Sequence, residues 1–320
     1  MMSADEIKQQ LPPPIAARVR SVRLNEGVAT LVADASGLGR AEATALQEAI
    51  ERTVGGLSGV SEVRVALMAD KVQRRIIAVG SGKGGVGKST LTANLAVALA
   101  RMGRKVGVVD ADIYGPSQPT LLDAGNRKPT AEGKQLIPVD SDFGVKLLSM
   151  GQLVAPGKAI AWRGPMTGSA LGQLMDARWG DTELLLVDLP PGTGDVQLTM
   201  LQKFKPAGAI VVSTPQDLAL IDATRALDLF RQADIPIVGI VENMAGYICP
   251  HCGEPSDPFG NGGAEAAASA LGEAFLGRIP LAMDIRIASD AGQPPAANDG
   301  AQGQPFAAIA ARLGEWLDRQ

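Results

Sequence analysis

The sequence predicts an α/β fold in which a mainly parallel sheet is covered by helices on both faces and preceded by a small α+β domain. From residue 76 onward, short apolar runs rich in β-branched residues alternate with segments of helical periodicity, the pattern of a parallel sheet buried on both faces. A glycine-rich loop joins the first of these strands to the first helix. Residues 1–70 show alternating strands around one helix and therefore predict a separate domain.

The first domain, residues 1–70, is expected to be a β-β-α-β unit. Apolar and polar residues alternate on both sides of Asn25-Glu26-Gly27, which indicates a hairpin. A helical pattern follows and stops at Gly55-Gly56. The expected strands are residues 17–24, 28–33 and 60–68, and the expected helix is residues 41–54. Residues 71–75 are polar and basic, which indicates a linker to a second domain, residues 76–320.

The second domain carries the alternation of strands and helices. Its expected strands are residues 76–80, 105–110, 145–149, 183–189, 208–214 and 235–243. Its expected helices are residues 91–102, 166–177, 218–233, 264–271 and 306–317, and the Pro- and Gly-rich residues 292–303 predict a loop. Parallel sheets of this kind bind ligands beyond the carboxyl ends of their strands, where the chemical motifs of this chain are found.

The loop after the first strand has the spacing of a phosphate-binding loop. Gly82, Gly87, Lys88 and Ser89 satisfy G-x-x-x-x-G-K-[ST] between a predicted strand and a predicted helix. Lys88 is expected to contact the β- and γ-phosphates of ATP, and Ser89 to bind Mg²⁺. A glycine-rich surface turn is the alternative. Backbone N–H groups and the helix N-terminus favour phosphate oxygens, so the expected nucleotide-binding residues are Gly82, Lys83, Gly84, Gly85, Val86, Gly87, Lys88, Ser89 and Thr90.

Two further strand ends carry carboxylates beside this loop. Asp110 and Asp112 follow the second strand, and we expect Asp112 to orient the attacking water and Asp110 to support the Mg²⁺ region. Either aspartate could instead cap the next helix. Asp188 ends a later strand and is expected to hold Mg²⁺ directly or through water, while the N–H of Gly192 senses the γ-phosphate. Together with the loop, these residues predict slow, Mg-dependent ATP hydrolysis.

An amide and a cysteine pair follow the strand at residues 235–243. Asn243 is placed to recognise the exocyclic group of adenine, although a simple turn residue is the alternative. Cys249 and Cys252 have the spacing Cys-x-x-Cys, which provides half of a four-thiolate metal site. The chain has no other cysteine, and its single histidine, His251, lies between the two. One chain cannot complete a four-thiolate site, whereas two chains related by a twofold axis can.

Three other interpretations of the cysteine pair stay open on this reasoning. The pair could be a thioredoxin-like redox couple, a zinc site across the dimer, or two unreactive residues that act as small apolar side chains.

Composition argues against several classes of partner. The net charge is −4 and aromatic residues make up 3% of the chain, which is unfavourable for a nucleic-acid-binding surface. The first ten residues are polar rather than signal-like, and no apolar run is long enough to cross a bilayer. The final helix has balanced charges instead of a basic membrane-binding face. We therefore expect a cytoplasmic protein that binds neither nucleic acid nor membrane.

Five stretches together resemble the Mrp/ApbC family of P-loop ATPases. They are residues 83–90 (KGGVGKST), 110–117 (DADIYGPS), 162–166 (WRGPM), 188–195 (DLPPGTGD) and 249–252 (CPHC). The first is similar to the deviant Walker A loop, whose additional lysine, here Lys83, reaches the nucleotide of the facing subunit and serves catalysis with Lys88. The resemblance implies a homodimer that binds ATP and Mg²⁺ and holds a [4Fe-4S] cluster between the Cys249–Cys252 pairs of its subunits. It also implies exchange of that cluster with scaffold proteins and apo-proteins.

The resemblance extends, less closely, to the first domain. Residues 1–70 are similar to the small iron–sulfur-assembly domain that often precedes this ATPase, but they contain no cysteine. Two rival functions are weighed against the cluster carrier. One is a dimeric partitioning or positioning ATPase with a structural zinc at the cysteine pair. The other is a nitrogenase-type reductase, whose cysteines would lie far apart in the chain.

Overall fold

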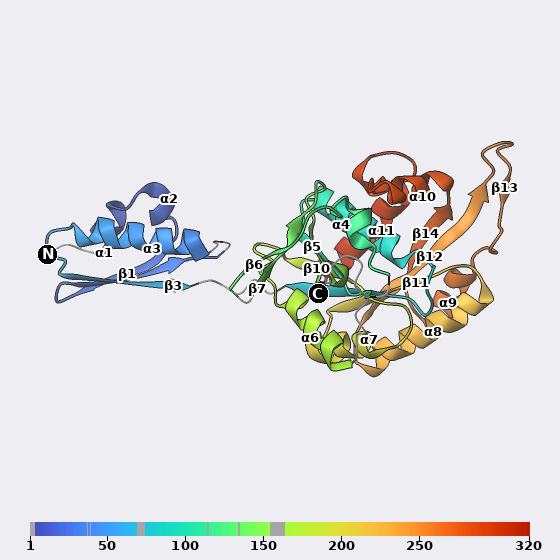
Figure 1. The fold of residues 1–320 in the computed structure, drawn as a ribbon, viewed down its shortest axis with the longest axis horizontal. Coiled ribbons are helices and arrows are strands. Elements are labelled where there is room, and N and C mark those ends of the chain that lie inside the picture. The colour runs from blue at the N-terminus through green and yellow to red at the C-terminus, as the bar shows by residue number, and fades with distance from the viewer. Residues whose placement is uncertain are drawn as a thin grey trace. The chain divides into compact units, whose positions relative to one another are not determined.

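The structure is a computed structural model that describes residues 4–36, 38, 40–68, 74–113, 115–133, 135–153 and 164–320. The chain divides into two compact units, Met1–Gln73 and Arg74–Gln320 (Figure 1). Residues 71–73 of the expected linker, Tyr114, and Trp162-Arg163 of the WRGPM stretch lie outside the described residues. Within the described ranges, no helix is both long enough and apolar enough to span a membrane.

The described part of the N-terminal unit is a three-stranded sheet with a long helix packed against it. Strands β1 (Val19–Asn25) and β2 (Val28–Asp34) form an antiparallel hairpin, and β3 (Glu62–Met68) pairs in parallel with β2. Helix α3 (Arg40–Gly55) connects β2 to β3, and α1 (Ala4–Gln9) and α2 (Pro13–Ala16) precede the sheet. The predicted β-β-α-β order is therefore confirmed.

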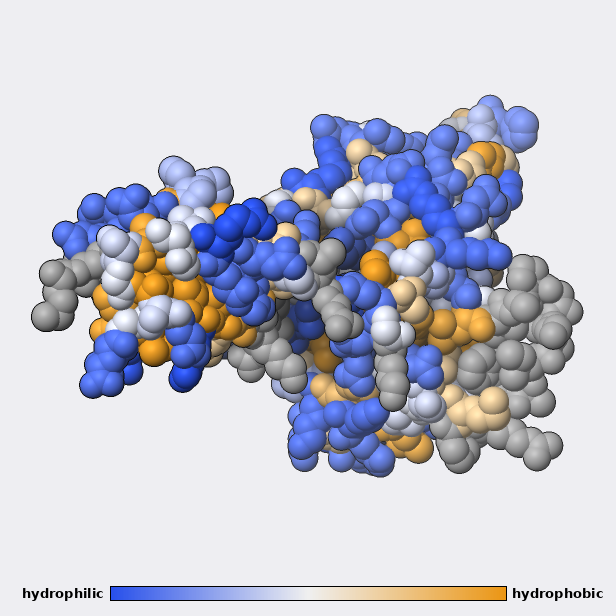
Figure 2. Space-filling model, turned by 60° about the vertical axis from the view of Figure 1, so that its left-hand side comes forward, coloured by the Kyte–Doolittle hydropathy of each residue, from blue (hydrophilic) through white to orange (hydrophobic). Residues whose placement is uncertain are grey.

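The core of this unit lies between α3 and the inward face of the sheet. Leu31 of β2 and Ile50 of α3 are fully buried at its centre. Hydrophobic residues around them, such as Leu24 and Val63, are only partly buried. Figure 2 shows apolar residues over much of the visible face of this unit. A small domain of this kind has too few layers to cover its core completely.

Among the described residues, the C-terminal unit is built on a nine-stranded sheet. Its strand order is β13-β12-β11-β4-β10-β5-β9-β8, and β14 also pairs with β12. The pairings are parallel except for β12 with β13 and β8 with β9. The strands are β4 (Arg75–Gly80), β5 (Val106–Asp110), β8 (Val139–Asp140), β9 (Lys146–Ser149), β10 (Leu184–Asp188), β11 (Gly208–Ser213), β12 (Ile237–Ile248), β13 (Pro255–Ser256) and β14 (Phe275–Leu281). A separate ribbon joins β6 (Thr130–Glu132) to β7 (Gln135–Ile137).

Helices cover both faces of this sheet, which confirms the predicted fold class (Figure 1). One face carries α4 (Lys88–Arg101), α10 (Met283–Asp290) and α11 (Gln304–Asp318), and the other carries α6 (Gly164–Met175), α7 (Asp195–Thr199), α8 (Asp217–Gln232) and α9 (Gly263–Leu271). Short α5 (Gln118–Leu121) follows β5, a π-helical turn (Met200–Phe204) continues α7, and 3₁₀ turns lie at Met150–Leu153 and Pro295–Ala297. All residues of the central strand β10 are buried, which explains its continuous apolar sequence.

Several elements of the structure were not predicted from the sequence or extend beyond their predicted bounds. Strand β12 continues past residue 243 to Ile248. Strand β14 and helix α10 were not predicted. The segment 292–303, expected to be a loop, contains a 3₁₀ turn whose Pro295 and Ala296 are buried against α4. Its backbone is anchored by the Asn94 side chain, which accepts the N–H of Ala296 at 2.9 Å.

Candidate functional site

The predicted phosphate-binding loop lies at the carboxyl end of β4, in the middle of the sheet, and leads directly into α4. Gly85 and Gly87 have φ angles of 79° and 82°, a region that favours glycine. A Cβ atom on Gly87 would lie 2.0 Å from Nδ2 of Asn243. That amide nitrogen donates to the carbonyl oxygen of Val86 at 2.8 Å. The structure therefore places Asn243 directly against the loop.

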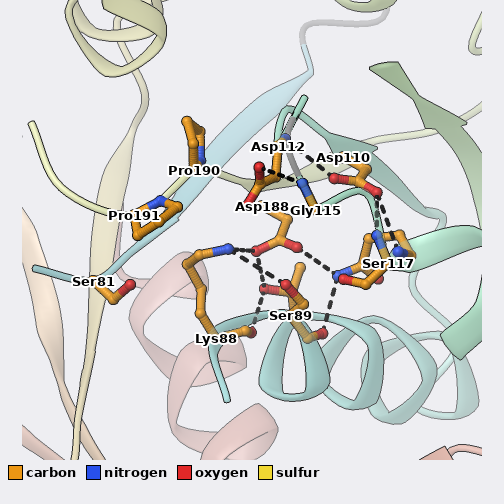
Figure 3. Close-up of polar contacts among 12 residues, drawn as sticks. Ser81, Lys88, Ser89, Asp110, Asp112, Gly115, Ser117, Asp188, Pro190 and Pro191 are labelled. Atoms are coloured by element: carbon orange, nitrogen blue, oxygen red, sulfur yellow. Dashed lines mark hydrogen bonds and ion pairs between the residues drawn. The ribbon is translucent and has the colours of Figure 1, made fainter. Parts of the chain in front are cut away.

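A buried ion pair lies at the first turn of α4 (Figure 3). Lys88 Nζ contacts Asp188 Oδ1, and the two side chains are 7% and 0% exposed. The hydroxyl of Ser89 lies 3.4 Å from the same ammonium. Thr92 Oγ1 lies 3.5 Å from Asp188 Oδ1, and Gln118 Nε2 donates to Asp188 Oδ2 at 2.9 Å. Three residues predicted to serve the β- and γ-phosphates and Mg²⁺ are thus brought together.

Asp110 lies next to this pair and is fully buried. Its Oδ2 accepts the backbone N–H groups of Ser117 at 3.0 Å and Gln118 at 3.1 Å, and the Ser149 hydroxyl at 3.0 Å. Burial, together with the neighbouring carboxylate of Asp188, raises the pKa of Asp110 to about 7. The Asp110 carboxylate therefore caps the first turn of α5, the alternative role that its sequence position left open.

Asp112 lies beside a cavity beyond the carboxyl ends of β5 and β10. Its Oδ1 accepts the backbone N–H of Gly115 at 3.1 Å, a bond drawn in Figure 3. The cavity has a volume of about 520 Å³ and is also lined by Pro191, Asp195 and Gln197. The arrangement leaves room for a ligand or a water next to the Asp112 carboxylate.

Gly192 lies in the loop between β10 and α7 and has a φ angle of 86°. Its N–H donates to the carbonyl oxygen of Ser81 at 3.0 Å. Gln197 Nε2 donates to the carbonyl oxygens of Pro190 at 2.7 Å and Gly192 at 3.1 Å, which fastens the loop to α7. In this structure the Gly192 N–H is therefore engaged with Ser81, the residue that follows β4, and the expected contact with a γ-phosphate requires the loop to move.

Lys83, the additional lysine of the loop, contacts a residue of its own chain. Its Nζ lies 3.3 Å from Oε1 of Gln216, which immediately precedes α8. The backbone carbonyl of Lys83 accepts the hydroxyl of Ser81 at 2.9 Å. The reach of Lys83 toward a facing subunit stays a prediction.

A second cavity of about 190 Å³ adjoins the loop on the side of β12 and β14. It is lined by Gly87, Thr90 and Asn243 together with Met244 and Arg286. The buried carboxylates of Asp110 and Asp188 lie on the other side of the phosphate-binding loop. The cavity therefore has a suitable position for the nucleoside part of a nucleotide whose phosphates bind the loop.

Residues 247–256 form an exposed hairpin that we call the cysteine hairpin. Its arms pair Tyr247 with Ser256 in antiparallel register, and its tip closes through the N–H of Cys249, which donates to Glu254 O at 3.0 Å. Cys252 is exposed and Cys249 is half-buried. Backbone N–H groups of Cys252 and then His251 lower the pKa of the Cys249 thiol. Within the described ranges, no group of three or more His, Cys, Asp or Glu residues is arranged to hold a metal ion.

Comparisons with known proteins agree with these motifs. The model of the NUBPL iron-transfer P-loop NTPases, of the ParA type, matches residues 72–314. An iron-sulfur cluster carrier protein of Pseudomonas fragi is 45% identical over 266 residues, which cover 79% of this chain and 92% of that protein. A mitochondrial iron-sulfur protein required for NADH dehydrogenase, from Arabidopsis thaliana, is 49% identical over 221 residues, which cover 68% of this chain and 70% of that protein.

A solved structure is similar to this chain in both sequence and fold. The nucleotide-binding protein of Archaeoglobus fulgidus, in complex with ADP and with cobalt detected, is 39% identical and superimposes with a TM-score of 0.63. The match covers 72% of this chain and 91% of that chain. The resemblance of the five sequence stretches to the Mrp/ApbC carriers is thereby confirmed. This chain belongs to the NUBPL iron-transfer P-loop NTPase family.

Proposed function

We propose that this protein is a Mg-dependent ATPase that carries an iron–sulfur cluster as its cargo. In this proposal, Cys249 and Cys252 of two subunits hold one [4Fe-4S] cluster, which is received from scaffold proteins and passed to apo-proteins in the cytoplasm. The Pseudomonas fragi relative, an iron-sulfur cluster carrier protein, supports this class of function. The observation that carries the proposal is the exposed cysteine hairpin.

The cysteine hairpin carries one exposed thiol, Cys252, and one half-buried thiol, Cys249. The lowered pKa of Cys249 favours its thiolate, the form that ligates metal. A [4Fe-4S] cluster takes four thiolates, and no metal-binding group of three or more suitable side chains occurs in the described part of the chain. A second copy of the hairpin is the simplest source of the two missing ligands, because a twofold axis places identical pairs opposite each other.

The proposed binding and hydrolysis of ATP depend on the buried polar residues around Lys88 and Asp188. Lys88 is placed for the β- and γ-phosphates, and the Ser89 hydroxyl and Asp188 carboxylate are the oxygen donors that Mg²⁺ prefers. When Lys88 turns from Asp188 to the phosphates, that carboxylate is left as a buried acceptor for a cation. Bound Mg²⁺ would neutralise charge on the phosphates, while Asp112 orients the attacking water beside it.

Strand β12 connects the two halves of the site. It carries Asn243, which is bonded to the loop at Val86, and it ends at the cysteine hairpin. Between them, Met244 and Gly246 have φ angles of 61° and 74°, and the pairing of β12 with β14 is interrupted there. This interruption in the pairing of β12 allows the cysteine hairpin to change direction when the phosphate-binding loop binds nucleotide. We infer that nucleotide state alters cluster retention in this way.

Anaerobic purification tests the proposal. We expect brown protein with about four iron and four sulfide per dimer, and transfer of that cluster to an apo-protein whose activity requires one. Cys249→Ser and Cys252→Ser should each lose the cluster, whereas Ser256→Ala, a control at the base of the same hairpin, should retain it. Protein that stays colourless after reconstitution contradicts the proposal. Zinc at the pair together with salt-sensitive DNA binding would favour a partitioning ATPase instead.

A further inference from the structure

Gln118, the first residue of α5, is a fully buried polar residue beside the nucleotide site. Its side-chain nitrogen Nε2 donates to the backbone carbonyl of Ser89 at 2.9 Å and to Asp188 Oδ2 at 2.9 Å. One amide therefore ties the first turn of α4 to the carboxylate at the end of β10. These are the two elements that supply the proposed Mg²⁺ ligands.

The other half of the same amide lacks a partner. Gln118 Oε1 is completely buried and accepts no hydrogen bond among the described residues. Burying an amide oxygen without a donor costs about 1–3 kcal/mol, a cost that an apolar side chain of similar size would avoid. A glutamine at this position is therefore poorly explained by packing alone.

The charges around Gln118 explain why its side-chain nitrogen is useful as a hydrogen-bond donor to Asp188. Asp188 and Asp110 are both fully buried, and they are paired residues at the ends of the neighbouring strands β10 and β5. Gln118 contacts both carboxylates, because its backbone N–H donates to Asp110 Oδ2 at 3.1 Å and its side chain donates to Asp188. When Lys88 leaves Asp188 for a phosphate, Gln118 stays as the nearer neutral donor, since Thr92 lies 3.5 Å from Asp188 Oδ1.

We propose that Gln118 is a positioning residue for the Mg²⁺ site. Its side-chain nitrogen holds the Asp188 carboxylate and the backbone of Ser89 in a fixed relation, and its buried carbonyl oxygen would accept a hydrogen bond from a water bound to Mg²⁺. This inference rests on the proposed function, because it assumes that the loop binds a nucleotide together with Mg²⁺.

The test is the Mg²⁺ dependence of ADP binding by the full chain, measured with a fluorescent ADP analogue in titrations with and without Mg²⁺. Gln118→Met keeps the length of the side chain and the backbone bond to Asp110 but removes the amide. We expect it to weaken Mg²⁺ binding to the ADP-loaded protein about 10- to 100-fold, as loss of an outer-shell partner does, without changing metal-free ADP affinity. Gln118→Glu should lose at least as much, because it replaces the donor to Asp188 by a charge.

A matched control is Gln135→Met on the exposed β6–β7 ribbon, where the Gln135 side-chain amide donates to the backbone carbonyl of Asp176 at 3.2 Å. It should leave both affinities unchanged. Unaltered Mg²⁺ affinity in Gln118→Met would overturn the inference, and so would an equal loss of ADP affinity with and without the metal. If the wild-type chain shows no Mg²⁺ effect on ADP binding, the proposed function itself fails. If the wild type shows the effect and Gln118→Met retains it, only this inference fails.

Discussion

Replacing Lys88 by methionine should destabilise the nucleotide-free protein strongly. The substitution keeps an unbranched side chain but removes the ammonium that contacts Asp188, whose side chain is 0% exposed. Asp188 would then face the buried Asp110 with only neutral donors around it. Removing one partner of a buried ion pair costs about 3–5 kcal/mol, so we expect a loss of that size in the free energy of unfolding at pH 8.

Urea unfolding followed by tryptophan fluorescence measures this loss of stability in the C-terminal unit. All three tryptophans, Trp162, Trp179 and Trp316, lie in the C-terminal unit, so the signal is independent of the N-terminal unit. Lys88→Met, Asp188→Asn and the double variant form a mutant cycle. The double variant should be less destabilised than the sum of the single ones, because it leaves no unpaired buried charge.

An exposed ion pair provides the control for this experiment. Lys105 and Asp181 are 3.6 Å apart, with side chains 60% and 59% exposed, and Lys105→Met should cost no more than about 1 kcal/mol. A Lys88→Met loss as small as that of Lys105→Met, together with additive effects in the cycle, would refute the buried pairing as the source of stability.

Three further predictions concern single residues of the C-terminal unit. The pKa of Asp110 is raised from 3.8 to about 7. Protonated Asp110 therefore contributes its full stabilisation of the folded state below about pH 4, and this contribution is lost as the pH rises through about 7. The free energy of unfolding should therefore fall by up to ~1.4 kcal/mol per pH unit in that window, and Asp110→Asn should remove this slope in urea titrations at several pH values. Asn243→Ala should weaken binding of ADP more than of inosine diphosphate by calorimetry, if its amide recognises the exocyclic group of adenine; equal losses would contradict that role. Gly107→Ala should cost about 1–3 kcal/mol because its Cβ would lie 2.6 Å from the Trp179 ring, whereas Gly300→Ala, with its nearest contact at 3.7 Å, should be nearly neutral in thermal unfolding.

The elements with local signals were predictable from the sequence. Strand β4, the loop and α4 combine a buried apolar run, a fixed glycine spacing and a helical periodicity, all within one short stretch. Strand β14 lacks such a signal, because Gly277, Arg278 and Pro280 interrupt its apolar residues. Proline is tolerated there because β14 pairs only with β12 in the described sheet and lies at its edge.

Sequence motifs predict the residues of the site that would contact a ligand. They do not predict the residues that support those side chains. Lys88, Ser89 and Asp188 lie together as their spacing suggests. The bond from Gln118 to Asp188 joins residues 70 positions apart, and no local pattern predicts a side-chain contact of that range. The bond from Gln197 to Pro190 spans only 7 positions, but it depends on the path of the loop between β10 and α7, which no sequence pattern predicts.

Native mass spectrometry of anaerobically purified protein shows whether two chains share one cluster. We expect a dimer that carries a single [4Fe-4S] cluster and separates into metal-free monomers when Cys249 is replaced by serine. A monomer that retains iron by itself, or a Cys249→Ser dimer that still carries the cluster, would contradict this expectation.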